Sequence, residues 1–257
     1  MQHIFLSDVH LGAFSEEKNR QLENTLIKLI DYCAEQSIGI HILGDLFDYW
    51  MEFPDYTPPL GKKLLNRFEK FNHTVEPATF VTGNHDNWTL GHFAGLGFRV
   101  EHEYRDFTID SQKILLLHGD GLADRKMNLP RPLLHKLLRN KTFISLYRNI
   151  FSGDTGNHLM KQFSEFTRNE NDLHPERLNR WSKNILKKKH YHYLIAGHDH
   201  LPRMETNLYG TYINTGAFYR HQTVALYNNH VIQLVIWNGE KNKFKLFKNH
   251  RTEPVLQ

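Results

Sequence analysis

Cysteine is almost absent from this chain of 257 residues, which contains one, Cys33. A single cysteine cannot form an internal disulfide. Cys33 falls on the apolar side of a helical pattern with Leu26 and Leu29, so we expect it to fill the core. Neither a disulfide framework nor a cysteine-based zinc site therefore fits this sequence.

Long apolar runs are also missing, and none approaches the length of a membrane span. No basic segment followed by an apolar one opens the chain, because the short run at residues 3–6 leads directly into a polar motif. Internal repeats and low-complexity tracts are absent. We therefore expect a cytoplasmic protein, and 40% hydrophobic residues fit one large α/β domain with an insertion.

The chain carries more positive than negative charge. The formal net charge is +4 at pH 7, and the isoelectric point is near 9.0. A positive excess favours an anionic partner but does not name it.

Five short polar motifs follow one another along the chain, each at the end of an apolar run. They are Asp8-Val9-His10, Gly44-Asp45-Leu46-Phe47-Asp48, Gly83-Asn84-His85-Asp86, His118-Gly119-Asp120 and Gly197-His198-Asp199-His200. The runs before them predict buried strands at residues 4–6, 38–43, 78–81, 114–117 and 193–196. Because functional sites of open α/β sheets lie at the carboxyl ends of the strands, we expect the motifs to converge.

The side chains in these motifs are carboxylates, an amide and imidazoles, which suit Mn, Fe, Zn or Mg ions. Asp8 and His10 can reach one ion as their strand breaks. His198 and His200 can serve two different ions from one loop, and Asp45 is the natural bridging carboxylate. Two ions about 3.5 to 4 Å apart clamp phosphoryl oxygens. The motifs therefore predict hydrolysis of a phosphate ester or anhydride.

The ordered set resembles the calcineurin-like metallophosphoesterase superfamily over residues 3–200. The resemblance implies an α/β fold, a four-layer αββα sandwich, with two divalent ions, Mn²⁺ being expected and Fe, Zn or Mg the alternatives. The implied ligands of the first ion are Asp8, His10, Asp45 and His200, and those of the second are Asp45, Asn84, His118 and His198.

Two further residues of the motifs receive catalytic roles from this resemblance. His85 is similar to a histidine that contacts the phosphate and protonates the leaving oxygen without binding metal. Asp86 is then expected to hold the outer nitrogen of His85. Asp48 resembles another supporting carboxylate, although a simple strand-end cap would look the same in the sequence.

A closer resemblance, to the UDP-2,3-diacylglucosamine pyrophosphohydrolases of lipid A synthesis, rests on residues 44–53, 118–122 and 124–126. It implies a nucleotide-sugar lipid substrate contacted by Asn84, His85, Asp124 and Arg125. It also implies peripheral association with an anionic inner membrane, and no protein partner. The sequence departs from that family at His85, at Asp199 and at residues 214–218.

The organisation of the chain predicts a catalytic sandwich from residues 1–120 and 190–257, with a helical cap from 121–189. The clearest helices span residues 22–33 and 60–71. After the cap, two strand pairs, 203–206 with 212–214 and 224–227 with 231–237, predict a second, mainly antiparallel sheet. The remaining histidines, among them His3, His41 and His135, are predicted to be surface or half-buried residues.

The cap admits two interpretations. Apolar residues alternate with basic ones along it, which is typical of an amphipathic lid that holds acyl chains at an anionic membrane. Two ordinary helices packed on the sandwich would show the same pattern, and the resemblance alone favours lipid. The apolar set is Leu133, Leu134, Leu137, Leu138, Ile144, Tyr147, Ile150 and Phe151, and the basic set is Arg131, Lys136, Arg139, Lys141 and Arg148.

The leading hypothesis is a dimetal hydrolase that cleaves UDP-2,3-diacylglucosamine at the α phosphate. The alternative keeps the chemistry and changes the substrate to a nucleotide or nucleic acid. Nucleic acid is disfavoured because no long basic stripe with interleaved aromatics is present. A binding scaffold without activity would be expected to have lost ligands, and all seven ligand positions are intact.

Overall fold

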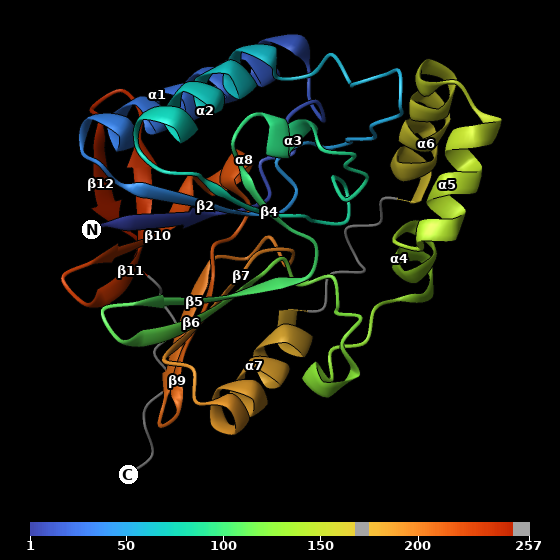
Figure 1. Ribbon diagram of the computed structural model, residues 1–257. Helices are drawn as coiled ribbons and strands as arrows, with labels where there is room; N and C mark the ends of the chain where they lie inside the picture. The colour runs from blue at the N-terminus through green and yellow to red at the C-terminus, as the bar shows by residue number, and fades with distance from the viewer. Residues whose placement is uncertain (168–174, 249–257) are drawn as a thin grey trace.

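The computed structural model, which describes residues 1–167 and 175–248, contains two mixed sheets enclosed by helices (Figure 1). The strand order is β12-β11-β10-β1-β2-β3-β4 in the first sheet and β5-β6-β7-β9-β8 in the second. The strands are β1 (His3–Leu6), β2 (Gly39–Leu43), β3 (Thr79–Val81), β4 (Arg99–Glu101), β5 (Tyr104–Ile109), β6 (Gln112–Leu117), β7 (Tyr193–Ala196), β8 (Arg203–Asn207), β9 (Gly210–Asn214), β10 (Thr223–Asn228), β11 (Val231–Asn238) and β12 (Lys243–Leu246).

The helices cover the outer sides of the sheets and one flank of the molecule. They are α1 (Glu16–Glu35), α2 (Lys62–Thr74), α3 (His92–Gly95), α4 (Leu133–Leu138), α5 (Lys141–Ile150), α6 (Gly153–Thr167), α7 (Pro175–Lys189) and α8 (Phe218–His221), with a 3-10 turn η1 (Arg125–Met127). Figure 1 shows α1 and α2 over the first sheet, α7 under the second, and α4 to α6 along the right-hand flank.

The apolar runs form strands because both faces of each strand are buried. Ile4 and Leu6 pack in the layer beneath α1 and α2, whereas Phe5 between them points into the layer between the two sheets. Such two-sided burial makes a parallel strand read as a continuous apolar run. The five predicted strands and the two clearest helices are confirmed.

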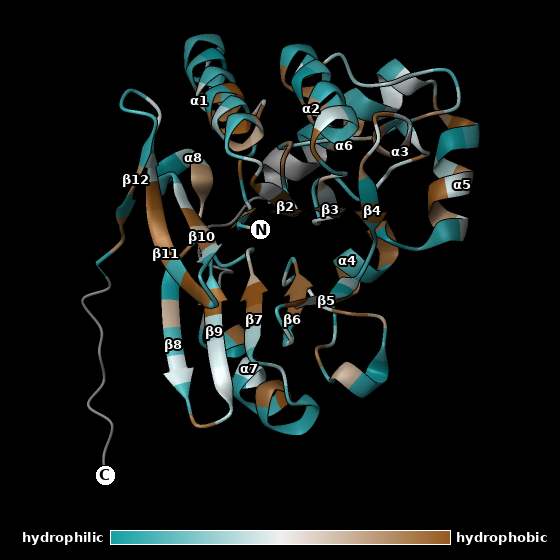
Figure 2. Cartoon of the chain, turned by 60° about the vertical axis from the view of Figure 1, so that its left-hand side comes forward, coloured by the Kyte–Doolittle hydropathy of each residue, from teal (hydrophilic) through white to brown (hydrophobic). Residues whose placement is uncertain are grey.

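Three apolar layers hold the sandwich together. One lies between the first sheet and α1 and α2, one between the two sheets, and one between the second sheet and α7. Figure 2 shows the apolar strands facing one another across the middle layer. Cys33 is fully buried in the first of these layers, which confirms its expected place in the core.

The prediction is wrong about which strands belong to the second sheet. The β10–β11 hairpin forms as expected, but β10 pairs with β1 and so extends the first sheet. The second sheet recruits β5 and β6 from the N-terminal half, and it has two parallel pairs and two antiparallel pairs. The local pattern defines a hairpin, but it does not determine which sheet the hairpin joins.

The segment predicted to form the cap divides into two parts. Leu178, Trp181, Ile185 and Leu186 of α7 pack on the second sheet, so α7 is an outer layer of the sandwich. Helices α4 to α6 instead pack on the loops after β2 and β3. The predicted boundaries also include residues 168–174 and 249–257, which lie outside the described residues.

Two histidines depart from their expected surroundings. His3 and His41 are buried, and His3 Nδ1 lies 3.0 Å from His41 Nε2. Burial lowers the pKa of His3 to about 4, and it holds the pKa of His41 well below its usual range. Both are therefore neutral at pH 7.

Candidate dimetal site

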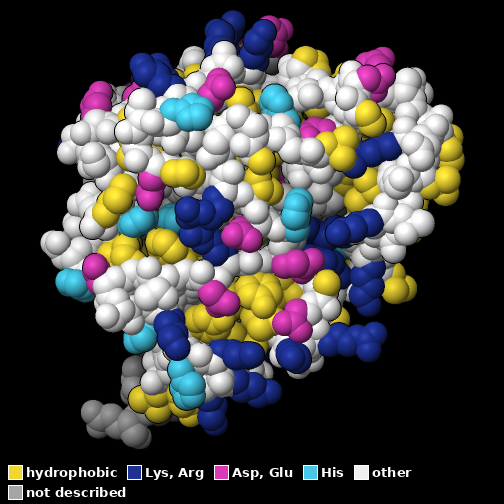
Figure 3. All heavy atoms as spheres, viewed as in Figure 1, with side chains coloured by type: hydrophobic (Ala, Val, Ile, Leu, Met, Phe, Trp, Pro, Cys, Tyr) yellow, Lys and Arg dark blue, Asp and Glu magenta, His cyan; other side chains and the backbone are white. Residues whose placement is uncertain are grey.

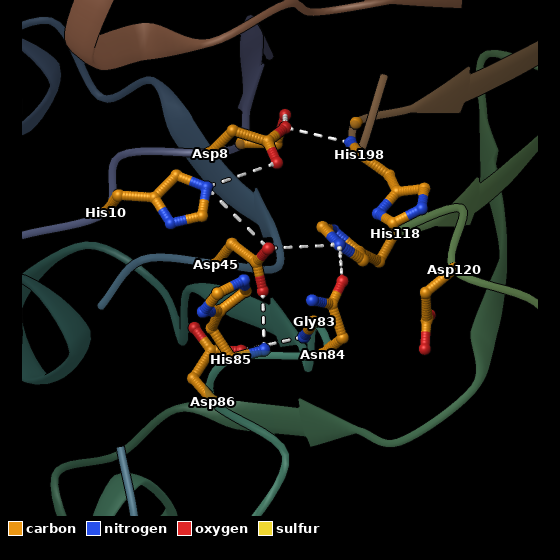
Figure 4. A network of polar contacts seen from close by, with 12 residues as sticks. Asp8, His10, Asp45, Gly83, Asn84, His85, Asp86, His118, Asp120 and His198 are labelled. Carbon is orange, nitrogen blue, oxygen red and sulfur yellow. Dashed lines mark hydrogen bonds and ion pairs between the residues drawn. The ribbon is translucent and has the colours of Figure 1, made fainter. Parts of the chain in front are cut away.

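Residues in left-handed backbone conformation gather where the strands end. Asp8 and His10 follow β1 with φ of 51° and 48°, Asp45 follows β2 with φ of 53°, and His198 and His200 follow β7 with φ of 70° and 55°. Residues other than glycine rarely adopt such angles, which cost of order 1 kcal/mol or more each. These five strained residues lie at one edge of the sandwich, where side chains of several loops point toward one place (Figure 4).

The first half of the site joins the two sheets. Asp8 Oδ1 lies 3.3 Å from His200 Nε2 and 3.8 Å from His10 Nε2, and the two imidazole nitrogens are 3.2 Å apart. The other carboxylate oxygen of Asp8 accepts hydrogen bonds from Ser7 Oγ and, at 2.9 Å, from the His198 backbone N–H. The Asp8 side chain is thus fixed with one oxygen directed at the histidines.

Asp45 lies between the two halves of the site. Its Oδ2 is 3.8 Å from His10 Nε2 and 3.3 Å from His118 Nε2, and both contacts are drawn as dashed lines in Figure 4. Its Oδ1 accepts the His85 backbone N–H at 2.9 Å. A Cβ atom at Gly83 would overlap Asp45 Oδ1, which explains why glycine stands there. This position suits the bridging role predicted for Asp45.

The second half of the site is built around His118. Its Nε2 lies 3.0 Å from Asn84 Oδ1, and its Nδ1 donates to the Leu43 carbonyl at 2.8 Å, which turns Nε2 inward. The His198 ring is 5.0 Å from the His118 ring, measured between centroids. The structure thus brings all seven predicted ligands to one site.

The carboxylates of Asp8 and Asp45 stay ionised although they are buried. Burial alone would raise the pKa of Asp8, but His200 beside it holds that pKa at about 2. Burial likewise opposes charge on Asp45, yet His118 and His85 keep its pKa well below the usual range. Burial lowers the pKa of His198 to about 3, so this imidazole is neutral and suited to metal binding.

These residues fit divalent metal. Asp8 Oδ1 is buried and has no hydrogen-bond partner, although two imidazole nitrogens lie near it. Ligand atoms lie within 4.8 Å of one another in three groups of the described residues: Asp8, His10 and His200; His10, Asp45 and His85; and Asp8, Asp45 and His118. Asp8, His10 and Asp45 each belong to two of these groups, which is consistent with two neighbouring ions. His198 falls outside these groups.

The predicted pairing of Asp86 with His85 is wrong. Asp86 is buried and accepts the backbone N–H groups of Leu46 and Gly83, each at 2.7 Å. The Nδ1 atom of His85 instead donates to the Asp48 carbonyl at 2.6 Å. The prediction rested on the adjacency of His85 and Asp86 in the sequence. The loop instead turns the Asp86 carboxylate toward the backbone of Leu46 and Gly83.

The Asp48 carboxylate supports the site from behind. Its Oδ1 lies 3.4 Å from His10 Nδ1, the ring nitrogen turned away from Asp8. A carboxylate in that position orients a ligating histidine and increases its basicity. This placement favours the supporting role over a simple strand-end cap.

The two predicted substrate residues after the fourth motif take different positions. Asp124 begins the turn η1, where its Oδ1 accepts the Lys126 N–H at 2.9 Å. Arg125 is exposed. Their role as substrate contacts stays a prediction.

Sequence reasoning missed two residues that α4 and its end bring to the site. Arg139 is half-buried and donates to Asp120 Oδ2 at 3.0 Å and to the Gly83 carbonyl at 2.8 Å. His135 lies beside Asp120 and His198. The one available signal was their four-residue spacing, which puts both on one side of a helix.

The whole arrangement has known relatives. A family model described as calcineurin-like phosphoesterase matches residues 1–202. This chain belongs to that family. Membership makes it a metal-dependent phosphoesterase, and the clustered aspartates and histidines are consistent with the dimetal site of such enzymes.

Named relatives of this phosphoesterase include the UDP-2,3-diacylglucosamine hydrolase of Coxiella burnetii. It is 28% identical over 214 residues, which cover 79% of this chain and 82% of the relative. The UDP-2,3-diacylglucosamine hydrolase of a Shewanella species is 26% identical over 213 residues, with the same shares covered. Among solved structures, the phosphoesterase Yfce of E. coli superposes with a TM-score of 0.49 at 17% identity, over 95% of this chain and 96% of that one.

Proposed function

We propose that this phosphoesterase hydrolyses the pyrophosphate of UDP-2,3-diacylglucosamine at the α phosphate, giving UMP and 2,3-diacylglucosamine 1-phosphate. The observation that carries the proposal is an apolar, partly exposed helical flank attached directly to the dimetal site. The names of the relatives support it, since their similarity spans about four fifths of the chain.

The seven ligands would hold two ions, with Mn²⁺ the expected metal. Two such ions clamp phosphoryl oxygens and activate water at neutral pH. We propose that His85, whose Nδ1 is held by the Asp48 carbonyl, contacts the phosphoryl group and gives a proton to the leaving oxygen.

Helices α4 to α6 form the proposed acyl-binding cap, and their inner side is well packed. Met160 of α6 packs with Met51, Phe53 and Trp88 of the neighbouring loops, and the Trp88 indole N–H donates to the Leu138 carbonyl at 2.7 Å. Tyr147 packs against the same group. The cap is thus firmly attached to the loops that follow β2 and β3.

The outer side of the cap exposes large apolar side chains. Leu133 of α4 is 82% exposed, and Figure 3 shows hydrophobic side chains along the edge where Figure 1 places α5. The exposed set on the cap is Leu133, Leu134, Leu137, Leu146, Ile150 and Leu159. Burial of each methylene of an acyl chain against such a surface contributes about 0.8 kcal/mol.

The basic residues of the cap form two groups: arginines that contact other residues and lysines that are exposed. Arg131 and Arg139 are paired with Asp120 or Glu103, and Arg148 lies over the Trp88 ring. Lys136 and Lys141 remain exposed. We propose that these lysines and the exposed leucines support peripheral association with an anionic membrane. No helix in the described part of the chain is long and apolar enough to cross a bilayer.

The test compares UDP-2,3-diacylglucosamine with UDP-glucosamine, which lacks the acyl chains, in detergent. We expect a marked preference for the acylated substrate, because the apolar cap adds affinity for the chains. Leu137→Glu should abolish this preference while hydrolysis of bis-nitrophenyl phosphate persists. Leu208→Glu is the matched control, since Leu208 is 97% exposed in the turn between β8 and β9. Equal rates on both sugars would contradict the proposal and favour a nucleotide phosphodiesterase.

A further inference from the structure

The end of α4 fixes the cap to the loops that bear the second half of the site. Arg139 donates to Asp120 at 3.0 Å, to the Thr82 carbonyl at 3.1 Å and to the Gly83 carbonyl at 2.8 Å. Gly83 precedes the ligand Asn84, and Asp120 lies two residues after the ligand His118. The position of α4 is therefore set by the same loops that set these ligands.

His135 lies four residues before Arg139, on the same side of α4. Its ring centroid is 6.2 Å from that of His198, and its Nδ1 is 3.8 Å from Asp120 Oδ2. The side chain is 20% exposed. Nδ1 is buried without a hydrogen-bond partner, and the ring makes no hydrogen bond to any described residue. A polar ring beside the site is thus left without a hydrogen-bond partner among the described residues.

We propose that His135 is a substrate-contacting residue, whose imidazole donates a hydrogen bond to an oxygen of the phosphoryl group bound beside His198. This contact rests on the proposed phosphohydrolase function of the dimetal site. Hydrogen bonds to a phosphate oxygen are charge-assisted, and they are stronger in a site that excludes water. Nδ1 lies 3.8 Å from Asp120 Oδ2 and makes no hydrogen bond, so the neutral ring can carry its proton on Nε2 and donate it to the substrate. The cap then contributes to the chemistry as well as to lipid binding.

The test uses bis-nitrophenyl phosphate as substrate, inorganic phosphate as inhibitor, and protein supplied with Mn²⁺. His135→Phe keeps the shape of the ring and removes both nitrogens. We expect kcat to fall about 10²-fold, as for loss of a donor to the developing charge. The inhibition constant of inorganic phosphate should rise about tenfold, while metal content and Tm stay at the wild-type values. His135→Gln should recover part of both losses, because its amide can still donate.

Two further variants separate a substrate contact from a structural role. His135→Asn has the same amide on a shorter side chain, so it should fail as His135→Phe does. His158→Phe is the matched control on α6, since His158 is exposed and contacts Gln162. Wild-type kinetics in His135→Phe, or loss of metal in proportion to activity, would overturn the inference. Neither probe contains uridine or acyl chains, so these outcomes do not depend on whether UDP-2,3-diacylglucosamine is the substrate.

Discussion

At the scale of single residues, His85 best illustrates how a motif and its surroundings combine. Its backbone N–H contacts Asp45, its Nδ1 is held by Asp48, and its ring lies edge-on to His10 with centroids 4.9 Å apart. The ring is fixed at the site while its Nε2 stays available. His85 can therefore act on the substrate without belonging to the predicted ligand set.

We predict that His85→Ala retains two ions per chain and loses turnover by about 10² to 10⁴, the usual contribution of a positioned acid or phosphate donor. Metal analysis and kcat on bis-nitrophenyl phosphate provide the check. Because His85 is close enough to His10 and Asp45 to share an ion, loss of metal in parallel with rate would show that it is a ligand.

The sequence could predict which residues gather at the site, because each ligand directly follows an apolar run. It could not predict the partners of those residues, because these come from distant loops. His85 is held by Asp48 on the loop after β2, and Arg139 bonds with Thr82, 57 positions earlier. His135 shows no motif at all, and its placement depends on the packing of α4.

At the scale of elements, the buried strands were predictable and the exposed ones were not. Strands β1, β2 and β7 are apolar on both faces, so their sequences are continuous apolar runs. Strands β4 and β12 are short, lie at sheet edges and contain no buried residue, so they lack that signal. Likewise, the pattern of α7 identifies a helix but not the sheet that it covers.

The contacts of Arg139 give a prediction for α4. Burial opposes charge on Asp120, but Arg139 and His118 hold its pKa at about 2. The pairing therefore stabilises the fold above about pH 4, and it is lost as the pH falls toward 2. We predict that Arg139→Leu lowers the free energy of unfolding by about 3 kcal/mol at pH 7, because it leaves a buried carboxylate poorly paired.

Urea denaturation at pH 7 provides the measurement for Arg139→Leu, with Lys136→Leu as the matched control. Lys136 belongs to the same helix and is exposed, so its replacement removes an equal charge with little effect on stability. If both variants unfold at the same urea concentration, α4 is not anchored through Arg139.

At the scale of the whole molecule, the site joins the two sheets. Asp8, His10, Asp45 and Asn84 follow strands of the first sheet, and His118, His198 and His200 follow strands of the second. Each predicted ion would therefore have ligands from both sheets. Because metal bound to the folded state alone stabilises that state, chelation should lower the Tm.

The bridging role predicted for Asp45 is to organise two ions at this junction. Its most direct test is the number of ions per chain, measured together with turnover of bis-nitrophenyl phosphate, in the wild type and in Asp45→Ala. Glu240→Ala is the control, since Glu240 is an exposed carboxylate in the turn between β11 and β12. We predict two ions and full activity in the wild type and the control, and loss of metal and turnover with a largely intact fold in Asp45→Ala. Two ions with normal activity in Asp45→Ala would contradict the account.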